Sequence, residues 1–213
     1  MIEIQNVTKV YGKQTVLSCV SATLEAGRIY GLVGINGSGK TTLMRCICGF
    51  THPTSGKIIV NGDEIGKRVD FPKRTGIIIE TPGFLPHYSG LRNLLLLAGV
   101  SHGATKERAA QVMRQVKLDP DDKKPVAQYS LGMRQRLGIA QAIMEDPEIL
   151  ILDEPFNGLD QSGIEEIHQL FEELRKKGKT ILLASHSAAD ISRACDCVFE
   201  IEDGILQEKS RES

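Results

Sequence analysis

One glycine-rich segment limits what this chain can fold into more than any other feature. Residues 34–41 read GINGSGKT and fit the pattern G-x-x-x-x-G-K-[ST]. An apolar run at 29–33 precedes the segment, and a helical pattern from about 40 to 49 follows it. In such a strand–loop–helix unit, glycines let backbone N–H groups close around phosphate oxygens, and the helix N-terminus favours an anion. The segment therefore predicts a phosphate-binding loop.

The residue types in this loop predict contacts with a nucleotide and with a magnesium ion. Lys40 would bridge the β and γ phosphates, and Thr41 would bind Mg²⁺. The residues expected to contact the nucleotide here are Asn36, Gly37, Ser38, Gly39, Lys40, Thr41 and Thr42. The alternative is an ordinary glycine-rich turn, which the strand before the loop and the helix after it disfavour.

A pair of carboxylates lies about 110 residues further along the chain. The apolar run 149–152 ends in Asp153, Glu154 and Pro155. A carboxylate at the end of a buried strand is costly unless it meets a cation or solvent. We therefore expect Asp153 to hold Mg²⁺ and Glu154 to polarise an attacking water as a general base.

The rest of the pattern predicts an α/β fold, because strands alternate with helices in a way typical of a largely parallel sheet. Early hairpins add an antiparallel layer, and the helical stretch 89–145 is an insert. Predicted strands are 2–5, 16–20, 29–33, 57–60, 75–80, 149–152, 180–184 and 198–201, with a last hairpin strand and polar tail in 204–213. Predicted domains are 1–87 (first part of the core), 88–145 (helical subdomain) and 146–213 (second part of the core).

Composition excludes several other classes of protein. The 213 residues carry 27 acidic and 26 basic side chains, a net charge of −1, so there is no basic field to drive nucleic-acid binding. No apolar stretch approaches the ~20 residues that a membrane span needs. The first residues lack the basic and then apolar pattern of a signal peptide. We therefore expect a cytosolic, soluble chain with no nucleic acid as partner.

The segment that begins at Ser130 predicts a second anion-seeking helix start. Ser130 is a natural N-cap for the helix that follows it, and a capped helix is the plainest interpretation. However, the loop at 34–41 already supplies the phosphate contacts of its own nucleotide. A second site of this kind therefore implies a second ligand, or a nucleotide held by a partner chain.

Taken in order, the phosphate loop, the Ser-x-Gly helix start, the Asp-Glu-Pro strand and His186 resemble the ATP-binding cassette (ABC) ATPases over essentially the whole chain. The resemblance implies a P-loop NTPase core that uses ATP and Mg²⁺. It implies that Tyr11 stacks on adenine and that Asp160 lies in a loop crossing a dimer interface. It also implies that His186 contacts the γ-phosphate and orders Glu154.

Two positions depart from the family's usual pattern. The signature usually reads Leu-Ser-Gly-Gly-Gln, whereas this chain has Ser130 and Gly132 with Leu131 between them and Met133 after them. The position after the strand at 75–79 is usually Gln and here is Glu80, which can still bind Mg²⁺ but adds charge beside the γ-phosphate. Both departures resemble the branch that exports bacitracin-like and lantibiotic peptides.

The resemblance implies a nucleotide-binding subunit of an ABC transporter. Two such chains, expected to be identical, would enclose two ATP molecules, each touching the phosphate loop of one chain and Ser130 and Gly132 of the other. The groove around 80–88 and the helical insert would receive a helix from a separate integral membrane permease. This partner would place the chain at the inner face of the cell membrane, and the cargo would be an antimicrobial peptide or a related compound.

Other functions remain as alternatives. A soluble ABC ATPase of repair, translation or cofactor assembly usually carries tandem cassettes, long inserts or a zinc module, which this sequence lacks. A slow nucleotide-gated binding module would use Glu80 and the altered signature, and a P-loop kinase would leave the helix start at Ser130 unexplained. A hydrolase triad through Ser185 and His186 is disfavoured, because adjacent residues leaving a strand point in opposite directions.

The remaining cysteines and histidines are predicted to be structural. The two C-x-C pairs, 46/48 and 195/197, lack the two to four intervening residues usual in zinc sites, so we predict small core residues in place of a metal site. The other histidines show no ligand spacing and are expected at the surface; they are His52, His87, His102 and His168.

Overall fold

The computed structural model describes residues 1–80, 83–101, 103–187, 191 and 193–209, so His102, Thr81, Pro82 and the tail 210–213 lie outside the described residues. The strands are β1 (Ile2–Tyr11), β2 (Gln14–Leu24), β3 (Ile29–Val33), β4 (Ser55–Val60), β5 (Asp63–Glu64), β6 (Thr75–Ile78), β7 (Ile149–Asp153), β8 (Thr180–Ser185), β9 (Cys197–Glu202) and β10 (Ile205–Lys209). The helices are α1 (Lys40–Ile47), α2 (Gly90–Ser101), α3 (Lys106–Gln115), α4 (Leu131–Ile143) and α5 (Gln161–Lys176), with a 3₁₀ turn at Val126–Gln128.

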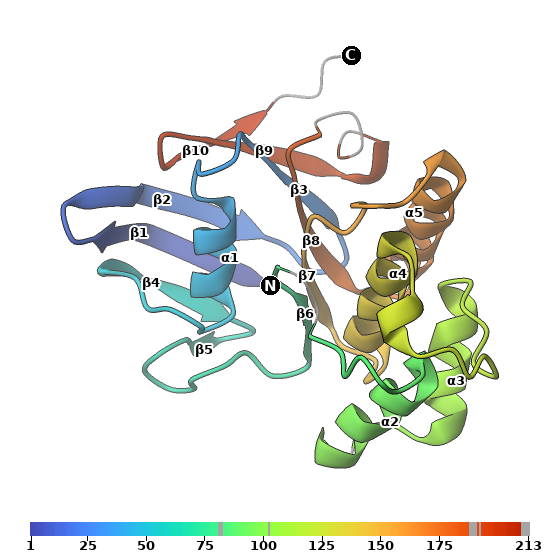
Figure 1. The fold of residues 1–213 in the computed structure, drawn as a ribbon. Coiled ribbons are helices and arrows are strands. Elements are labelled where there is room, and N and C mark those ends of the chain that lie inside the picture. Colours follow the sequence, from blue (N-terminus) through green and yellow to red (C-terminus); the bar gives the residue numbers. More distant parts are fainter. Residues whose placement is uncertain (81–82, 102, 188–190, 192, 210–213) are drawn as a thin grey trace.

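These strands form two sheets of different kinds (Figure 1). The six-stranded sheet has the order β10-β9-β3-β8-β7-β6, and all its pairs except β10 with β9 are parallel. The four-stranded sheet has the order β2-β1-β4-β5 and is antiparallel. The predicted fold class is therefore confirmed, whereas the predicted domain boundaries stay a prediction.

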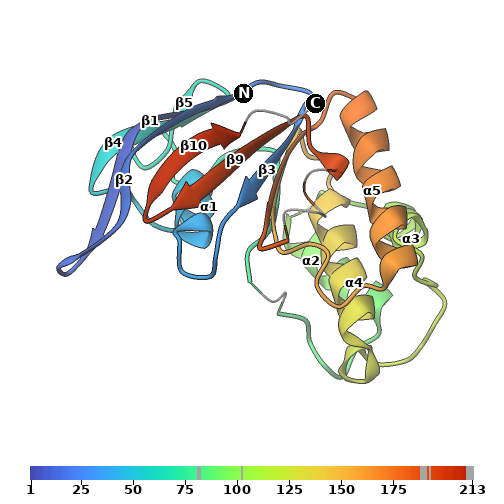
Figure 2. The same ribbon diagram turned by 90° about the horizontal axis from the view of Figure 1, so that it is seen from above.

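Helix α1 lies between the two sheets, as both views show (Figures 1 and 2). Its buried side chains include Leu43, Met44 and Ile47, which share one core with Leu17 of β2 and Ile151 of β7. A helix that is apolar on opposite sides must be covered on both sides. The run of apolar residues in α1 thus fixes it in the middle layer, with its first turn at the end of β3.

The other face of the large sheet is covered by α4 and α5, and α2 and α3 pack beyond α4 (Figure 2). Local signals set the ends of these helices. Thr105 caps α3 by accepting a hydrogen bond from the Arg108 N–H at 3.2 Å, and α5 ends in a basic last turn just before Gly178, at φ 81°. The helical insert therefore forms as predicted.

Strands β1 and β2 are longer than the sequence pattern predicts. The register between them shifts between Ile4 and Val7 and again further along, and Asn6 and Cys19 adopt φ 50° within the strands. Each irregularity breaks the alternation of buried and exposed side chains. The periodicity therefore reveals only the regular stretches of each strand.

The predictions for the remaining histidines and cysteines can also be compared with the structure. His52 and His87 are exposed, but His168 is half-buried, and its ring packs edge-on against Phe156 with centroids 4.7 Å apart. All five cysteines lie in described segments and none forms a disulfide. The described residues include no cluster of three or more His, Cys, Asp or Glu that could hold a metal, and no helix among them is long and apolar enough to cross a membrane.

Candidate active site

The parallel sheet brings the predicted site residues to one edge. Val33 at the end of β3 lies opposite Ser185 at the end of β8, and Asp153 at the end of β7 lies opposite Ala184. The carboxyl ends of these three strands therefore meet. In open α/β sheets this edge is where ligands bind. The phosphate loop, the two carboxylates and His186 all follow directly from these strand ends.

The phosphate loop has the backbone geometry of an anion site. Gly39 immediately precedes α1 at φ 114°, and no described side chain caps that helix, so its first N–H groups face the loop without a side-chain acceptor. A methyl group on Gly39 would lie 2.9 Å from the Val16 carbonyl oxygen and 3.0 Å from Leu17 Cδ2. The loop is thus packed tightly against β2, and only glycine fits there.

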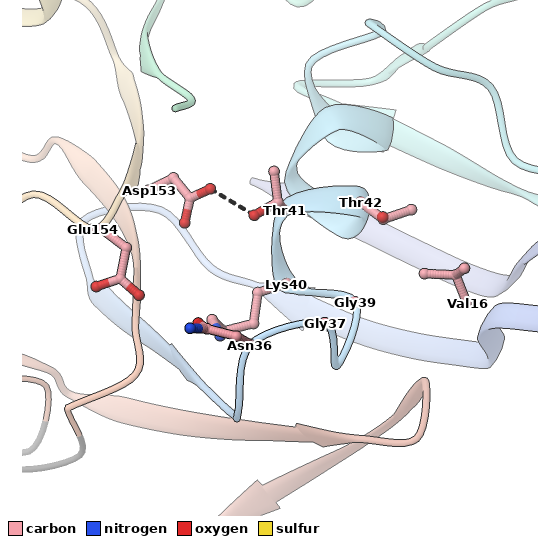
Figure 3. Close-up of a pocket in the computed structure, with 9 residues that line it drawn as sticks. All are labelled: Val16, Asn36, Gly37, Gly39, Lys40, Thr41, Thr42, Asp153 and Glu154. Carbon is pink, nitrogen blue, oxygen red and sulfur yellow. Dashed lines mark hydrogen bonds between the residues drawn. The ribbon is translucent and has the colours of Figure 1, made fainter. Parts of the chain in front are cut away.

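A pocket of about 190 Å³ opens above the loop (Figure 3). It is lined by Val16, Asn36, Gly37, Gly39, Lys40, Thr41, Thr42, Asp153 and Glu154. The Lys40 ammonium donates to the carbonyl oxygens of Gly34 at 2.7 Å and Ile35 at 3.1 Å. Ser38 is buried beside the pocket, and its Oγ has no hydrogen-bond partner among the described residues. A buried hydroxyl in that position fits a ligand that supplies oxygen acceptors.

Asp153 and Thr41 form a pair of oxygen ligands at one side of the pocket (Figure 3). Thr41 Oγ1 donates to Asp153 Oδ2 at 2.7 Å, although the residues are 112 positions apart. Burial raises the pKa of the Asp153 carboxyl, the Thr41 hydrogen bond opposes that rise, and the charge of Glu154 adds to it. A hydroxyl beside a carboxylate is a donor set that Mg²⁺ accepts. The residues present therefore fit this cation.

Glu154 is held by the strand that runs beside β7. Its carboxylate accepts hydrogen bonds from Ser185 Oγ at 3.1 Å and from the His186 N–H at 3.0 Å, and the His186 ring Nδ1 lies 3.0 Å from Glu154 Oε1. Glu154 adopts φ 49°, and Gln135 donates to its carbonyl oxygen at 3.1 Å. The Ser185 hydroxyl is therefore directed to Glu154, which argues against a hydrolase triad.

Several predicted residues do not line this pocket. Tyr11 is exposed at the end of β1 with the Lys9 ammonium 4.8 Å from its ring centroid, and Glu80 forms an ion pair with Arg45. Ser130 and Asp160 are exposed N-caps of α4 and α5; they accept hydrogen bonds from Met133 N–H at 3.1 Å and Gly163 N–H at 2.9 Å, respectively. Their predicted contacts with nucleotide stay predictions.

The start of α4 packs against the loop before α5. A Cβ on Gly132 would lie 2.6 Å from the Gly158 carbonyl oxygen, and a Cβ on Gly158 would lie 2.7 Å from Leu131 Cδ2. Gly158 itself adopts φ 76°. The departure at Leu131 therefore places a large side chain directly on the loop that contains Asp160.

Sequence reasoning missed three residues that position the predicted ones. They are Ser185 and Gln135, which bond to Glu154, and Arg45, which pairs with Glu80. Ser185 could have been found as the residue that ends β8 just before His186. The other two contacts depend on packing between helices and strands, so no local signal marks them.

A phosphate loop at the carboxyl edge of a mainly parallel sheet, beside a Thr–Asp pair and a held glutamate, defines the class of P-loop nucleotide-binding proteins. Residues 17–157 match the ABC transporter family, so the chain belongs to this family. This membership makes it an ATP-binding, ATP-hydrolysing subunit of an ABC transporter.

Characterised and uncharacterised relatives resemble the chain along nearly its whole length. The chain is 42% identical to the uncharacterized ABC transporter ATP-binding protein YybJ of Bacillus subtilis, over 97% of this chain and 95% of that protein. It is 40% identical to the bacitracin transport ATP-binding protein BcrA of Enterococcus faecalis (98% and 68%) and 39% identical to the lantibiotic transport ATP-binding protein SrtF of Streptococcus pyogenes (98% and 90%). The predicted resemblance to the bacitracin and lantibiotic branch is confirmed.

Solved structures show the same fold. The dimeric bacterial ABC transporter cassette MJ0796 superposes with a TM-score of 0.89 at 25% identity, covering 100% of both chains. An ATP-binding subunit of an ABC transporter superposes with a TM-score of 0.88 at 28% identity, covering 99% of this chain and 90% of that one.

Proposed function

We propose that two copies of this chain enclose two Mg²⁺-bound ATP molecules and drive a separate integral membrane permease. One observation carries the catalytic part of this proposal: Glu154 lines the pocket above the phosphate loop while His186 and Ser185 hold its carboxylate. A carboxylate fixed at that point is placed to accept a proton from a water attacking the terminal phosphate.

The phosphate loop binds and orients the triphosphate in this proposal. Lys40 exchanges its hydrogen bonds to its own loop for the β and γ phosphates, and the free N–H groups at the start of α1 face the phosphate oxygens. Thr41, Asp153 and Glu80 would hold Mg²⁺, which would offset the negative charge of the phosphates. His186 keeps the Glu154 carboxylate in place and contacts the γ-phosphate.

The partner in the nucleotide site is a second copy of the chain. Ser130, Gly132 and Asp160 stand at two neighbouring helix starts and do not line the pocket of their own chain. Helix N-termini with exposed caps favour an anion. These residues would therefore contact the nucleotide held by the other copy, while Tyr11 of each chain stacks on adenine.

The membrane partner would dock beside the phosphate-binding core. A groove of about 320 Å³ is lined by Phe50, Ile77, Ile78, Ile79, Gly83, Gly138 and Gln141. Phe50, which lines the groove, is exposed and packs edge-on against exposed Phe71, with ring centroids 6.1 Å apart. The groove combines apolar side chains with polar surface, so a short amphipathic helix of the permease would fit it. This contact would hold the chain at the inner face of the cell membrane. The similarity to BcrA, a bacitracin transport protein, and to SrtF, a lantibiotic transport protein, supports a bacitracin-like or lantibiotic peptide as cargo.

Replacing Glu154 tests the catalytic assignment. Glu154→Gln should bind ATP as the wild type does, lose phosphate release by at least about 100-fold, and accumulate an ATP-bound dimer in size-exclusion chromatography. The matched control is Glu148→Gln. Glu148 directly precedes the first residue of β7, whereas Glu154 directly follows the last. Equal turnover in wild type and Glu154→Gln would remove Glu154 from the mechanism.

A mixing experiment tests the shared site. Lys40→Ala should abolish ATP binding at its own loop, and Ser130→Ala should impair the site that it completes in the other copy. A mixture of the two single variants can form one intact composite site, so it should recover part of the wild-type turnover. If the mixture is no more active than either variant alone, the two-chain site is wrong. Phosphate release with and without a co-expressed permease then tests coupling to transport.

A further inference from the structure

We propose that Arg45 is a positioning residue that withholds Glu80 from the magnesium site until Mg²⁺-bound ATP arrives. This inference rests on the proposed function, because it concerns how the same site acquires one of its carboxylates. Its subject is the ion pair between the Arg45 guanidinium and Glu80 Oε1. That pair joins the helix after the phosphate loop to one of the two positions at which this chain departs from the family's usual pattern.

The pair follows from the geometry of α1. Thr41 and Arg45 are four residues apart, so they lie on one face of the helix, one turn from each other. The Thr41 hydroxyl donates a hydrogen bond to the Asp153 carboxylate, and one turn further on the Arg45 guanidinium forms an ion pair with the Glu80 carboxylate. One helix face thus engages both carboxylates that are proposed to share a magnesium ion.

The backbone at Glu80 shows that its position is constrained. Glu80 follows β6 at φ 63°, in the left-handed region that side-chain-bearing residues seldom adopt. Its side chain is 63% exposed, and it does not line the pocket above the phosphate loop. The carboxylate is therefore directed to Arg45 and not into the site where it would meet the ion.

Charge balance explains why this chain needs the pair. Asp153, Glu154 and Glu80 bring three carboxylates to one region, and the charge of Glu80 helps to raise the pKa of Asp153. Lys40 points its ammonium at the carbonyl oxygens of its own loop. Arg45 is the cation that pairs with Glu80, and a glutamine at position 80 would form no such ion pair. Glu80 therefore brings a carboxylate that can bind the ion, and Arg45 competes with the ion for that carboxylate.

Binding of Mg²⁺-bound ATP must then break this ion pair. Exposed ion pairs are weak, and the competition should reduce affinity by roughly two- to five-fold. Nucleotide without the metal does not recruit Glu80, so its affinity should not depend on Arg45. Mg²⁺-bound ATP, and not the nucleotide alone, would therefore release Glu80 from Arg45 beside the proposed permease groove.

The test is equilibrium binding of a fluorescent ATP analogue to the full chain, with excess Mg²⁺ and with EDTA. Arg45→Ala should tighten binding roughly two- to five-fold in Mg²⁺ and leave it unchanged in EDTA. Arg45→Lys, which keeps the charge, should behave like the wild type and shows that folding alone is not at issue. The matched control is Arg74→Ala, which breaks the ion pair between Arg74 and Glu148. These two residues directly precede β6 and β7, at the edge of the sheet opposite the phosphate loop. Arg74→Ala should change the affinity neither in Mg²⁺ nor in EDTA.

The second arm repeats the measurement in a Glu80→Gln background, where Arg45→Ala should have no effect. The inference is overturned if Arg45→Ala weakens or does not alter binding in Mg²⁺, if it changes binding equally in EDTA, or if its effect persists without Glu80. Failure of the proposed function would look different, because wild-type protein would then not bind the analogue in either condition.

Discussion

Gly158→Ala perturbs the contact between the altered signature and the loop before α5. Gly158 adopts φ 76°, and an alanine forced into that region costs about 1–2 kcal/mol. The added methyl would also lie 2.7 Å from Leu131 Cδ2 and 3.0 Å from Leu131 Cβ, an overlap that costs about 1–3 kcal/mol in a packed contact. The free energy of unfolding should therefore fall by about 2–5 kcal/mol.

Denaturant unfolding and thermal melts measure this loss. For a chain of this size, each kcal/mol corresponds to about 2–4 °C, so the melting temperature should fall by about 4–20 °C. Leu131→Ala alone should cost little, because Leu131 is 52% exposed. In the double variant the contacts with Cγ and Cδ2 are gone but the contact with Cβ remains, so most of the steric loss of about 1–3 kcal/mol should be recovered.

The double variant also shows which result would contradict the proposed contact between Leu131 and Gly158. If the two substitutions add to within about 0.5 kcal/mol, the two residues do not interact, and the close packing of Leu131 on Gly158 does not govern stability. The strain from φ 76° should remain in the double variant, so complete recovery would show that the backbone is not strained there.

Two further predictions concern Lys9 of β1 and the buried cysteines at the end of α1. Lys9→Met should weaken ATP binding roughly two- to five-fold and leave inorganic triphosphate unaffected, because the Lys9 ammonium lies over one face of the Tyr11 ring and the proposed stacking of adenine would use the other face. Competition binding measures this, and equal loss for both ligands would contradict it. At about pH 8, iodoacetamide should label exposed Cys19 well before Cys46 and Cys48. Burial raises the pKa of Cys46 to about 11 and the pKa of Cys48 to about 12. The reactive thiolate of these two residues is therefore scarce until the pH approaches those values. Mass spectrometry of the folded protein checks the order, and rapid labelling of Cys46 would refute it.

Much of the fold could be predicted because its signals are local. Buried parallel strands such as β3, β7 and β8 are continuous apolar runs, and the helix starts carry caps such as Thr105 and Ser130. The lengths of β1 and β2 could not be predicted. Their bulges interrupt the alternation on which the prediction depends, and pairing across the sheet maintains the strands through those interruptions.

In the candidate site, too, local features could be predicted from the residues themselves and contacts between distant residues could not. The sequence by itself determined which groups are present, because a glycine pattern that frees backbone N–H groups and a carboxylate at the end of an apolar strand are readable within a few residues. The tertiary structure decided which groups touch: Thr41 with Asp153, Glu154 with His186, and Glu80 with Arg45. Of these contacts, the one between Glu154 and His186 was also implied by the resemblance to the ABC ATPases. Those partners are 112, 32 and 35 residues apart, and their meeting depends on the order of strands in the sheet and on the placement of α1 between two layers. Packing of the whole chain sets that order, and no local spacing encodes it.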